Sequence, residues 1–586
     1  SQAGKIGLVS TLAVATAACG GGGSSSSGGT SGTPPVTGGG GTPAPTVVVP
    51  QSDDEAARFL LQASLSATPA EISTLRSEGF EPWLDRQMSR NNDQTARQYF
   101  STRGFDQVNA ERYYFNSRIA DSMLWSQLLQ GGSAVRKRAA LALSEFFVIS
   151  ISGIDNFWRS QAVGEYWDIL NDNAFGNFRD LLEQVTLNPT MGFFLNTLGN
   201  RKADPKSGRV PDENFGREIM QLFTIGLFEL NNDGTVRTSG GEPIETYDNE
   251  DVTGISKVFT GYDYDYNGIS FTPDAGGGDF DVPDPDYTRQ PMTADASRWR
   301  KPRDESFHSD AEKTFLGTTI PANTGPEDSL RIALDTLFEH PNVGPFFGKQ
   351  MIQRLVTSNP SPAYVDRVAS AFNNNGSGVR GDLRAVFKAI LLDDEARNMS
   401  NVTNANFGKL REPMLRFIQW ARTFGAQSSD GVFDLGDTSD TDRRLGQSPL
   451  RSPSVFNFFR PGYVPAGSQA ADRDLLAPEF QIVNETSVAG YVNTMERVID
   501  GSVWWLRDVS PQYTAELDLA DDSAALLDHL DLVLTAGQLS DNSRNLILPV
   551  LDEIDVTATS DNDTKLSRIH LAVLLIIASN DYLVQK

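Results

Sequence analysis

The apolar residues of this chain recur with helical spacing from about Ser52 almost to the C-terminus, and this pattern restricts the fold more than any other feature. The stretch "ATPAEISTLRSEGF" also carries helix boundary signals. Thr68 can cap a helix, Pro69 suits its first position, Glu71 completes a capping box and Gly79 can end it. The sequence therefore predicts a mainly α fold, built as a large multi-helix globular body.

Two long helices are predicted in residues 111–130 and 133–151, separated by the Gly-Gly pair at 131–132. The apolar run at 571–578 is too short to span a membrane, which takes roughly 20 residues, so we expect a buried core helix there. Further helices are predicted near residues 177–187, 212–225, 249–259, 327–339, 343–357, 362–373, 380–393, 408–424, 481–499 and 564–580.

Residues 228–325 break the helical pattern. "LFELNNDGTVRT" predicts a hairpin around Asp233-Gly234, and "YDYDYNGISF" predicts another around Asn267-Gly268. Asp, Gly and Pro then crowd the stretch that follows. We expect small β-hairpins and loops inserted into the helical body, and no repeat period indicates a solenoid.

The first 18 residues have the layout of a lipoprotein signal peptide. An apolar stretch, "IGLVSTLAVATAA" at residues 6–18, follows Lys5 and ends in small residues. The letters "TAAC", ending at Cys19, resemble the lipobox of bacterial lipoproteins, so we predict that Cys19 is lipidated. Gly20 is typical of sorting to the outer membrane, on its periplasmic or its surface-facing side. The alternative is an ordinary cleavable signal with an incidental cysteine.

Residues 19–50 are nearly all Gly, Ser, Thr and Pro and predict a flexible tether, because they bury too little apolar surface to fold. Residues 51–586 then form a single large helical domain, with the hairpin and loop insertion at 228–325. Cys19 is the only cysteine, so this domain has no disulfide, and its length allows an ample core without one.

The chain is strongly acidic, with 50 Lys and Arg against 76 Asp and Glu and a formal net charge of −26. This charge repels phosphate chains, so nucleic acid is not expected as a partner. Gly376, Gly378 and Gly381 have the spacing of a dinucleotide fingerprint, but they follow a predicted helix rather than a strand. We therefore expect an inter-helix turn and no nucleotide site.

Glu218, His308 and Asp251 are the catalytic candidates, and an enzyme would need them to converge in a cleft. Glu218 borders the apolar stripe of "NFGREIMQLFTIGL", where burial could raise its pKa for acid–base work; the alternative is a buried ion pair with an arginine. His308 lies in a polar loop near Asp310. It could be a general base or a metal ligand, and a capping or salt-bridge role is equally open.

Asp263, Asp265, Asn267 and Asp274 follow the spacing of a calcium-binding loop, whose carboxylates supply hard oxygen ligands. Calcium is the only cofactor that the sequence suggests. The tyrosines that alternate with these acids favour another interpretation, an antiparallel strand with one aromatic face.

The segment "SPLRSPSVFNFFRPGYVP" gathers Phe456, Phe458, Phe459 and Tyr463 beside Arg460. Aromatic rings beside a guanidinium can line a sugar-binding groove, and such a cluster can equally be part of the core. Both interpretations stay open at the level of sequence.

Eight segments stand in order from about residue 53 to the end: "AARFLLQASLSATPAEISTL", "NFGREIMQLFTIGL", "YDNEDVTGISKVFTGY", "FHSDAEKTFLG", "HPNVGPFFGKQMIQRLVTSNPSPAYVDRVASAF", "GVRGDLRAVFKAILLDDEAR", "KLREPMLR" and "SPSVFNFFRPGYVP". Together they resemble the bacterial domain-of-unknown-function family 1800. This resemblance implies an exported protein, with a partner in the envelope from a second exported family related to sulfatases. In the family pattern an Asp follows the histidine of "FHSDAEKTFLG" and a Gly comes shortly after. Ser309 and Ala311 stand there instead, which weakens a metal role for His308.

These observations favour a membrane-tethered binding or accessory protein that scaffolds an exported partner or polymer. The first alternative is a hydrolase that acts on envelope or extracellular polysaccharide. The second is a structural module stabilised by calcium.

Overall fold

The computed structural model describes residues 47–501 and 509–586. The predicted signal peptide, Cys19 and most of the predicted tether therefore lie outside the described residues. Residues 47–586 form one compact unit, which is described below.

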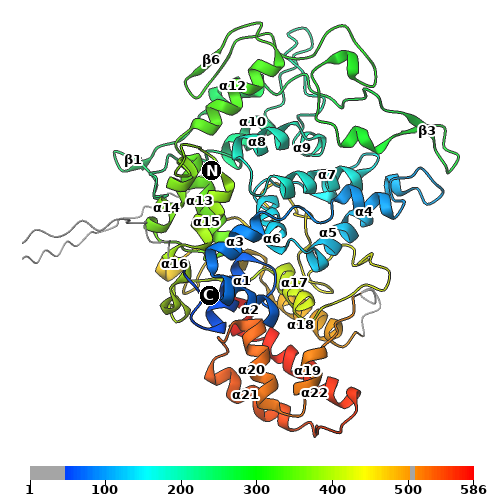
Figure 1. The fold of residues 1–586 in the computed structure, drawn as a ribbon. Coiled ribbons are helices and arrows are strands. Elements are labelled where there is room, and N and C mark those ends of the chain that lie inside the picture. Colours follow the sequence, from blue (N-terminus) through cyan, green and yellow to red (C-terminus); the bar gives the residue numbers. More distant parts are fainter. Residues whose placement is uncertain (1–46, 502–508) are drawn as a thin grey trace, which may run out of the picture. The chain divides into compact units, whose positions relative to one another are not determined.

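The first half of this unit is helical (Figure 1). The boundary signals around α2 work as predicted, because the Thr68 side chain accepts from the Glu71 N–H and the Glu71 side chain caps in return. The break at residues 131–132 between α5 and α6 is also confirmed. The helices are α1 (Asp53–Ala63), α2 (Pro69–Glu78), α3 (Phe80–Met88), α4 (Ala96–Thr102), α5 (Arg118–Gln130), α6 (Ala134–Ser144), α7 (Arg159–Asp172), α8 (Phe178–Leu187), α9 (Pro189–Phe194) and α10 (Asn214–Gln221).

The segment after α10 consists of loops, one α-helix, two short 3-10 helices (Pro285–Thr288 and Ala296–Arg298) and short antiparallel hairpins. The sequence predicts loops and small hairpins for this segment. The turn at Asp233-Gly234 is confirmed by a bridge between Leu230 and Val236. The elements are β1 (Thr238–Ser239) with β2 (Glu242–Pro243), α11 (Asn249–Ser256), β3 (Phe271–Pro273) with β4 (Asp281–Pro283), and β5 (Lys313–Phe315) with β6 (Thr318–Ile320).

The hairpin predicted around Asn267-Gly268 is wrong, although the chain does turn there. The strand after the turn, β3, pairs with β4, and Asp263 before the turn bridges to Thr293. The tyrosine rings explain the difference, because Tyr266 stacks on Tyr287, with ring centroids 5.4 Å apart, instead of packing across a local hairpin.

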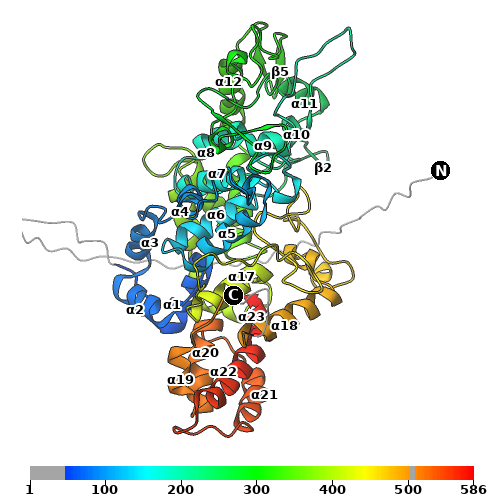
Figure 2. The same cartoon turned by 90° about the vertical axis from the view of Figure 1, so that its right-hand side faces the viewer.

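The second half is again helical, and its last strand, β8, pairs with β7 far earlier in the chain. Figures 1 and 2 show α12 at one end of the unit and α19 to α22 at the other, and Figure 2 shows α11 at the same end as α12. The elements are α12 (Pro326–Glu339), α13 (Val343–Leu355), α14 (Pro362–Asn373), α15 (Leu383–Leu391), α16 (Asp394–Arg397), β7 (Lys409–Leu410), α17 (Pro413–Thr423), α18 (Glu485–Ile499), α19 (Thr514–Leu519), α20 (Ser523–Leu530), α21 (Asp541–Asp552), α22 (Asn562–Ile577), α23 (Asn580–Leu583) and β8 (Val584–Gln585).

One large core runs through the helices, and the predicted core helix α22 contributes Ile569, Val573 and Ile576 to it. A smaller aromatic cluster around Trp158 and Tyr287 lies against β4. Within the described residues, no helix has the length and apolar character needed to cross a membrane. The prediction of a mainly α fold with small hairpins is confirmed.

The glycines at 376–381 lie in the turn between α14 and α15, as expected. The Asn374 and Asn375 side chains accept backbone N–H groups within that turn. No strand precedes the glycines, so the dinucleotide geometry does not arise.

Candidate functional site

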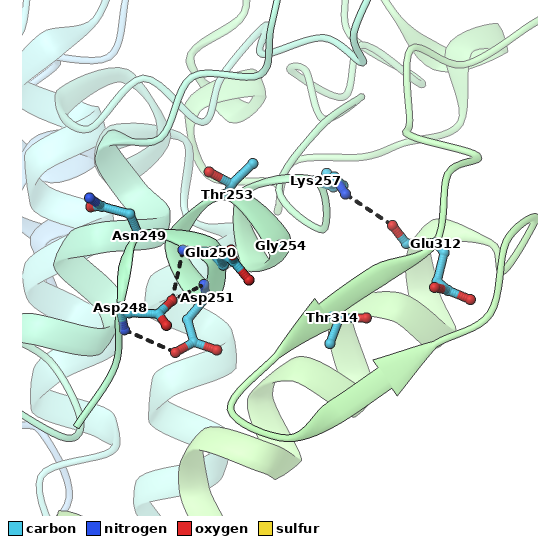
Figure 3. Close-up of a pocket in the computed structure, with 9 residues that line it drawn as sticks. All are labelled: Asp248, Asn249, Glu250, Asp251, Thr253, Gly254, Lys257, Glu312 and Thr314. Carbon is cyan, nitrogen blue, oxygen red and sulfur yellow. Dashed lines mark hydrogen bonds between the residues drawn. The ribbon is translucent and has the colours of Figure 1, made fainter. Parts of the chain in front are cut away.

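Asp251 has a structural role at the start of α11 (Figure 3). One carboxylate oxygen, Oδ2, accepts the N–H of Asp248 at 3.0 Å, and the Asp248 side chain accepts two N–H groups of the first turn in return. The other oxygen, Oδ1, accepts the N–H of Leu316 at 2.6 Å. Asp251 therefore caps α11 and ties it to the turn between β5 and β6.

A surface hollow of about 500 Å³ lies beside this helix start. Its lining includes the acidic residues Asp248, Glu250, Asp251 and Glu312, together with Lys257 (Figure 3). The Lys257 Nζ donates to the backbone carbonyl of Glu312 at 3.1 Å, so it does not neutralise these carboxylates directly. Neither Glu218 nor His308 belongs to this lining.

His308 is buried and electrically neutral near pH 7. Its Nδ1 lies 2.9 Å from the carbonyl oxygen of Thr260, which assigns the ring proton to Nδ1 and leaves Nε2 as an acceptor. Nε2 is buried and has no hydrogen-bond partner in the described part of the chain. Burial lowers the pKa of His308 to about 4. Asp310, its neighbour in sequence, pairs instead with Lys202, Nζ to Oδ2, at 3.1 Å.

Glu218 is buried on α10. The described part of the chain does not contain the buried ion pair with an arginine that is one of the two interpretations of this residue. No ion pair to Glu218 occurs among residues 47–501 and 509–586, and its Oε2 is buried without a hydrogen-bond partner there. Burial raises the pKa of the carboxyl group, with Arg217 opposing the shift. Leu222, one helical turn later on the same face, lines a cavity that is described below.

The three catalytic candidates do not form one constellation. Asp251 lines the hollow of Figure 3 and the other two do not, and within the described residues no hydrogen bond or ion pair joins any two of them. Their predicted convergence in a cleft is not found.

Three of the four residues of the predicted calcium loop have other side-chain partners, and for Asn267 only backbone contacts occur among the described residues. Asp274 forms an ion pair with Arg112 and accepts a hydrogen bond from Tyr114, and Asp265 forms an ion pair with Arg298. Asp263 accepts the N–H of Tyr264 at 2.8 Å. In the part of the chain that the structure describes, no group of three or more His, Cys, Asp or Glu side chains could hold a metal ion. Arginines therefore neutralise two of these carboxylates, and calcium binding by this segment stays a prediction.

A second cavity, of about 200 Å³, has chemistry better suited to a ligand, and we call it the Glu145 cavity. It is bordered by the end of α6, the end of α10, α13 and the loop at 455–461. Its apolar lining is Phe146, Val148, Leu222, Leu227, Phe346, Val455, Phe456, Phe459 and Pro461, and its polar lining is Glu145, Gln221, Gln350, Arg354, Asn457 and Arg460.

Glu145 follows the last turn of α6 and is 5% exposed. Its Oε2 lies 3.6 Å from Nε of Arg354, which is too long for a hydrogen bond, and its side chain is hydrogen-bonded to the buried carboxyl group of Glu412. Burial, and then the nearby Glu412 carboxylate, raise the pKa of Glu145 well above its ordinary value. The cavity wall thus holds a carboxyl group that favours its protonated form, donates its proton to Glu412 and can still accept hydrogen bonds.

A buried set of charges holds Glu145 and Arg354 in place behind the cavity. The Arg354 guanidinium donates to the Glu145 carbonyl oxygen at 2.8 Å. Lys409 Nζ donates to the Arg354 carbonyl oxygen at 2.8 Å and lies 3.0 Å from Oε1 of Glu479. Although burial opposes it, Lys409 lowers the pKa of Glu412, so Glu412 keeps its charge while Glu145 is the weaker acid of the two. These contacts fix the cavity wall rigidly.

The aromatic segment contributes to both the core and the cavity. Phe459 is buried, whereas Phe456 is half-buried and stacks under Arg460, whose guanidinium carbon lies 4.8 Å from the ring centroid. The two interpretations of this segment therefore apply to different residues. Three of the eight resemblance segments meet at this cavity, since Leu222, Arg354 and Phe456 come from different ones.

The sequence reasoning missed Glu145. Its signal is the charge content of "RKRAALALSEFF", where Arg138 and Glu145 lie seven residues apart, on one helical face of an otherwise apolar stretch. Both side chains are buried. Charged residues buried in an apolar helix usually serve a network or a site, because burying an unpaired charge is costly.

Comparison with known proteins identifies a family but no function. A family model described as "Protein of unknown function (DUF1800)" matches residues 58–584. No curated protein and no solved structure matches the chain.

Proposed function

Because this chain belongs to the DUF1800 family, for which no function is described, we propose its role from its own residues: a lipid-anchored, exported binding protein whose ligand occupies the Glu145 cavity. The observation that carries the proposal is the buried Glu145 carboxyl group at the wall of an aromatic cavity, where its side chain is hydrogen-bonded to the Glu412 carboxylate behind it. A ligand hydroxyl could donate to the lone pairs of the Glu145 carboxyl group that the bond to Glu412 does not use.

The chemistry of the lining favours a saccharide unit of an envelope or extracellular polymer. The rings of Phe146, Phe346 and Phe456 offer apolar faces, and Glu145, Gln350 and Arg460 offer donors and acceptors. At about 200 Å³ the cavity is smaller than most small-molecule sites, which run from roughly 300 Å³ upward. It suits one ring or one chain end rather than a long oligomer.

Titration calorimetry with oligosaccharides released from the producer's envelope and extracellular polysaccharide tests this role. We expect Phe456→Ala to weaken binding about tenfold, because an aromatic contact contributes about 1.4 kcal/mol. The matched control is Phe480→Ala, which removes a ring that is 43% exposed and lies outside the cavity lining. Equal affinity of the Phe456 variant and the wild type would place the ligand elsewhere.

The predicted location at the outer membrane would place the binding protein close to its ligand. Lipidation of Cys19 at the outer membrane, followed by a tether of Gly, Ser, Thr and Pro, would hold residues 51–586 near a polymer or an exported sulfatase-like partner. Cys19→Ser should move the protein from the membrane fraction to the soluble fraction. An affinity pull-down from solubilised envelopes should recover the partner from the wild type.

The hydrolase is retained as a second candidate because two carboxyl groups with raised pKa values lie near one cavity. Glu145 is in the lining, and Glu218 is one turn before Leu222 of the same lining. A protonated carboxyl group beside a bound saccharide could donate a proton to a glycosidic oxygen. Release of reducing ends that the wild type produces and Glu145→Gln does not would replace the binding role with this one.

A further inference from the structure

Two short segments of this acidic protein are strongly basic. Residues 201–209, "RKADPKSGR", hold four cations and one acid. Residues 298–305, "RWRKPRDE", hold four cations and two acids. If the two segments lie together in the fold, they form a positively charged surface on a chain whose formal net charge is −26.

The structure brings the two segments together around Phe307. The N–H of Lys202 donates to the Phe307 carbonyl oxygen at 2.8 Å. The guanidinium carbons of Arg201 and Arg303, one from each segment, lie 4.2 Å and 5.2 Å from the centroid of the Phe307 ring. Trp299 stacks on the same ring, with centroids 5.4 Å apart. Two guanidinium groups therefore share one aromatic ring.

The same surface continues in both directions along these segments. Arg209 Nε donates to the Lys202 carbonyl oxygen at 3.1 Å, which holds the far end of the first segment against its start. The Arg300 guanidinium carbon lies 5.2 Å from the centroid of Phe271 on β3. The arginines are thus held by rings and backbone rather than by carboxylates.

Two of the eight cations are neutralised, because Lys202 pairs with Asp310 and Arg298 pairs with Asp265. The other six are exposed and form no ion pair within residues 47–501 and 509–586. The one acid of the first segment, Asp204, accepts the N–H of Lys206 and the hydroxyl of Ser207 instead. We call the six the Phe307 patch: Arg201, Lys206, Arg209, Arg300, Lys301 and Arg303.

A bound anion would reduce the repulsion between the positive charges of this patch. Like charges close together repel, and among the described residues no carboxylate forms an ion pair with Arg201 or Arg303, although Asp263 attracts Arg201 from farther away. A guanidinium that lies over a ring keeps its N–H edges free, and those edges match the oxygens of sulfate, carboxylate or phosphate groups. Six cations spread over two segments suit repeated anionic groups better than a single ion.

We propose that the Phe307 patch binds an acidic polysaccharide through its sulfate or carboxylate groups. The rest of the protein disfavours the other polyanions, because its net charge of −26 repels a stiff nucleic acid or an anionic bilayer that would face more than the patch. A flexible polysaccharide strand can contact the patch alone. The patch shares no residue with the Glu145 cavity, so this site stands independently of the function proposed above.

The test measures binding of the full mature chain to immobilised dextran sulfate, with neutral dextran of equal length as the comparison. We expect binding to dextran sulfate only, with affinity that falls steeply as salt rises. The triple variant Arg201→Ala, Arg300→Ala and Arg303→Ala should lose at least tenfold in affinity. A matched triple variant removes three cations that already have carboxylate partners, at Arg76, Arg237 and Arg331, and should stay within twofold of the wild type.

Three results would overturn the proposal: no binding to dextran sulfate, equal losses in the two triple variants, or equal binding to neutral dextran. Vesicles that contain phosphatidylglycerol and single-stranded DNA are two further probes. If either binds as tightly as dextran sulfate and with the same dependence on the patch, the polysaccharide assignment is wrong. Unchanged dextran sulfate binding by Phe456→Ala would show that this site and the cavity are separate.

Discussion

The protonation of Glu145 gives a prediction that can be worked out from its surroundings. Its folded-state pKa is raised by burial and by Glu412, whereas in the unfolded chain it returns to about 4.3. The folded state therefore binds more protons than the unfolded state between these two pKa values. The stabilising contribution of this group is complete below about pH 4.3 and is lost as the pH rises toward the folded pKa.

The size of this loss follows from linkage. One proton bound only in the folded state changes the free energy of unfolding by about 1.4 kcal/mol per pH unit, so two pH units correspond to about 2.7 kcal/mol. This is an upper limit, because Glu412 shares part of the titration with Glu145. Glu145→Gln has nearly the same shape and cannot ionise, so it lacks this dependence. The variant should gain stability relative to the wild type as the pH rises.

Urea unfolding at half-unit steps from pH 5 to pH 8, at constant ionic strength, measures the difference between wild type and Glu145→Gln. Taking this difference cancels the other titrating groups, provided that distant sites act independently. Glu496→Gln, an exposed glutamate on α18, is the control and should follow the wild type at every pH. Parallel curves for wild type and Glu145→Gln would refute the reasoning, because they would mean that Glu145 ionises normally in the folded state.

Three further predictions test other parts of the structure. The ring resonances of His308 should titrate near pH 4 in an NMR titration. The free energy of unfolding should also fall as the pH drops from about 6.5 toward that value, because the folded state binds this proton less readily than the unfolded state. An NMR midpoint near pH 6.5 would contradict the effect of burial on His308. Addition of EDTA should leave the melting temperature unchanged, since arginines neutralise Asp265 and Asp274; a clear decrease would restore the calcium site. Gly254→Ala should destabilise the protein by about 1–3 kcal/mol in urea unfolding, because a Cβ there would lie 1.7 Å from the Thr314 carbonyl oxygen. Gly462→Ala is the control and should change stability little, because the space around Gly462 is open.

Helices with strong local signals could be predicted closely from the sequence. The capping box of α2 and the break between α5 and α6 depend on residues within one or two turns of each other. Boundaries set by distant contacts could not. The helix predicted from residue 408 begins instead at Pro413, because Lys409–Leu410 forms β7 and pairs with Val584–Gln585. The helix predicted through residue 151 ends at Ser144, and the chain after it borders the Glu145 cavity.

The candidate residues show the same division. Sequence reasoning found Glu218, which structure places one helical turn from the cavity lining, and it found the segment of Phe456 and Arg460. It did not find Glu145, whose environment comes from Arg354 and Glu412, more than two hundred residues away. Asp274 fitted a calcium pattern by spacing, but its partner Arg112 lies 162 residues earlier in the chain.

By itself the sequence determined the class of fold, the family, the acidic charge and most helix positions, because capping, apolar periodicity and composition act through near neighbours or through the chain as a whole. Only the tertiary structure decided which charged side chains have an oppositely charged partner and which do not. Arginines from other parts of the chain pair with Asp265 and Asp274 of the predicted calcium loop, and Glu145 is hydrogen-bonded to Glu412. The six cations of the Phe307 patch form no ion pair among the described residues. The partners of buried and clustered charges come from segments that are distant in sequence and meet only in the folded chain, so the local spacing of residues does not predict them.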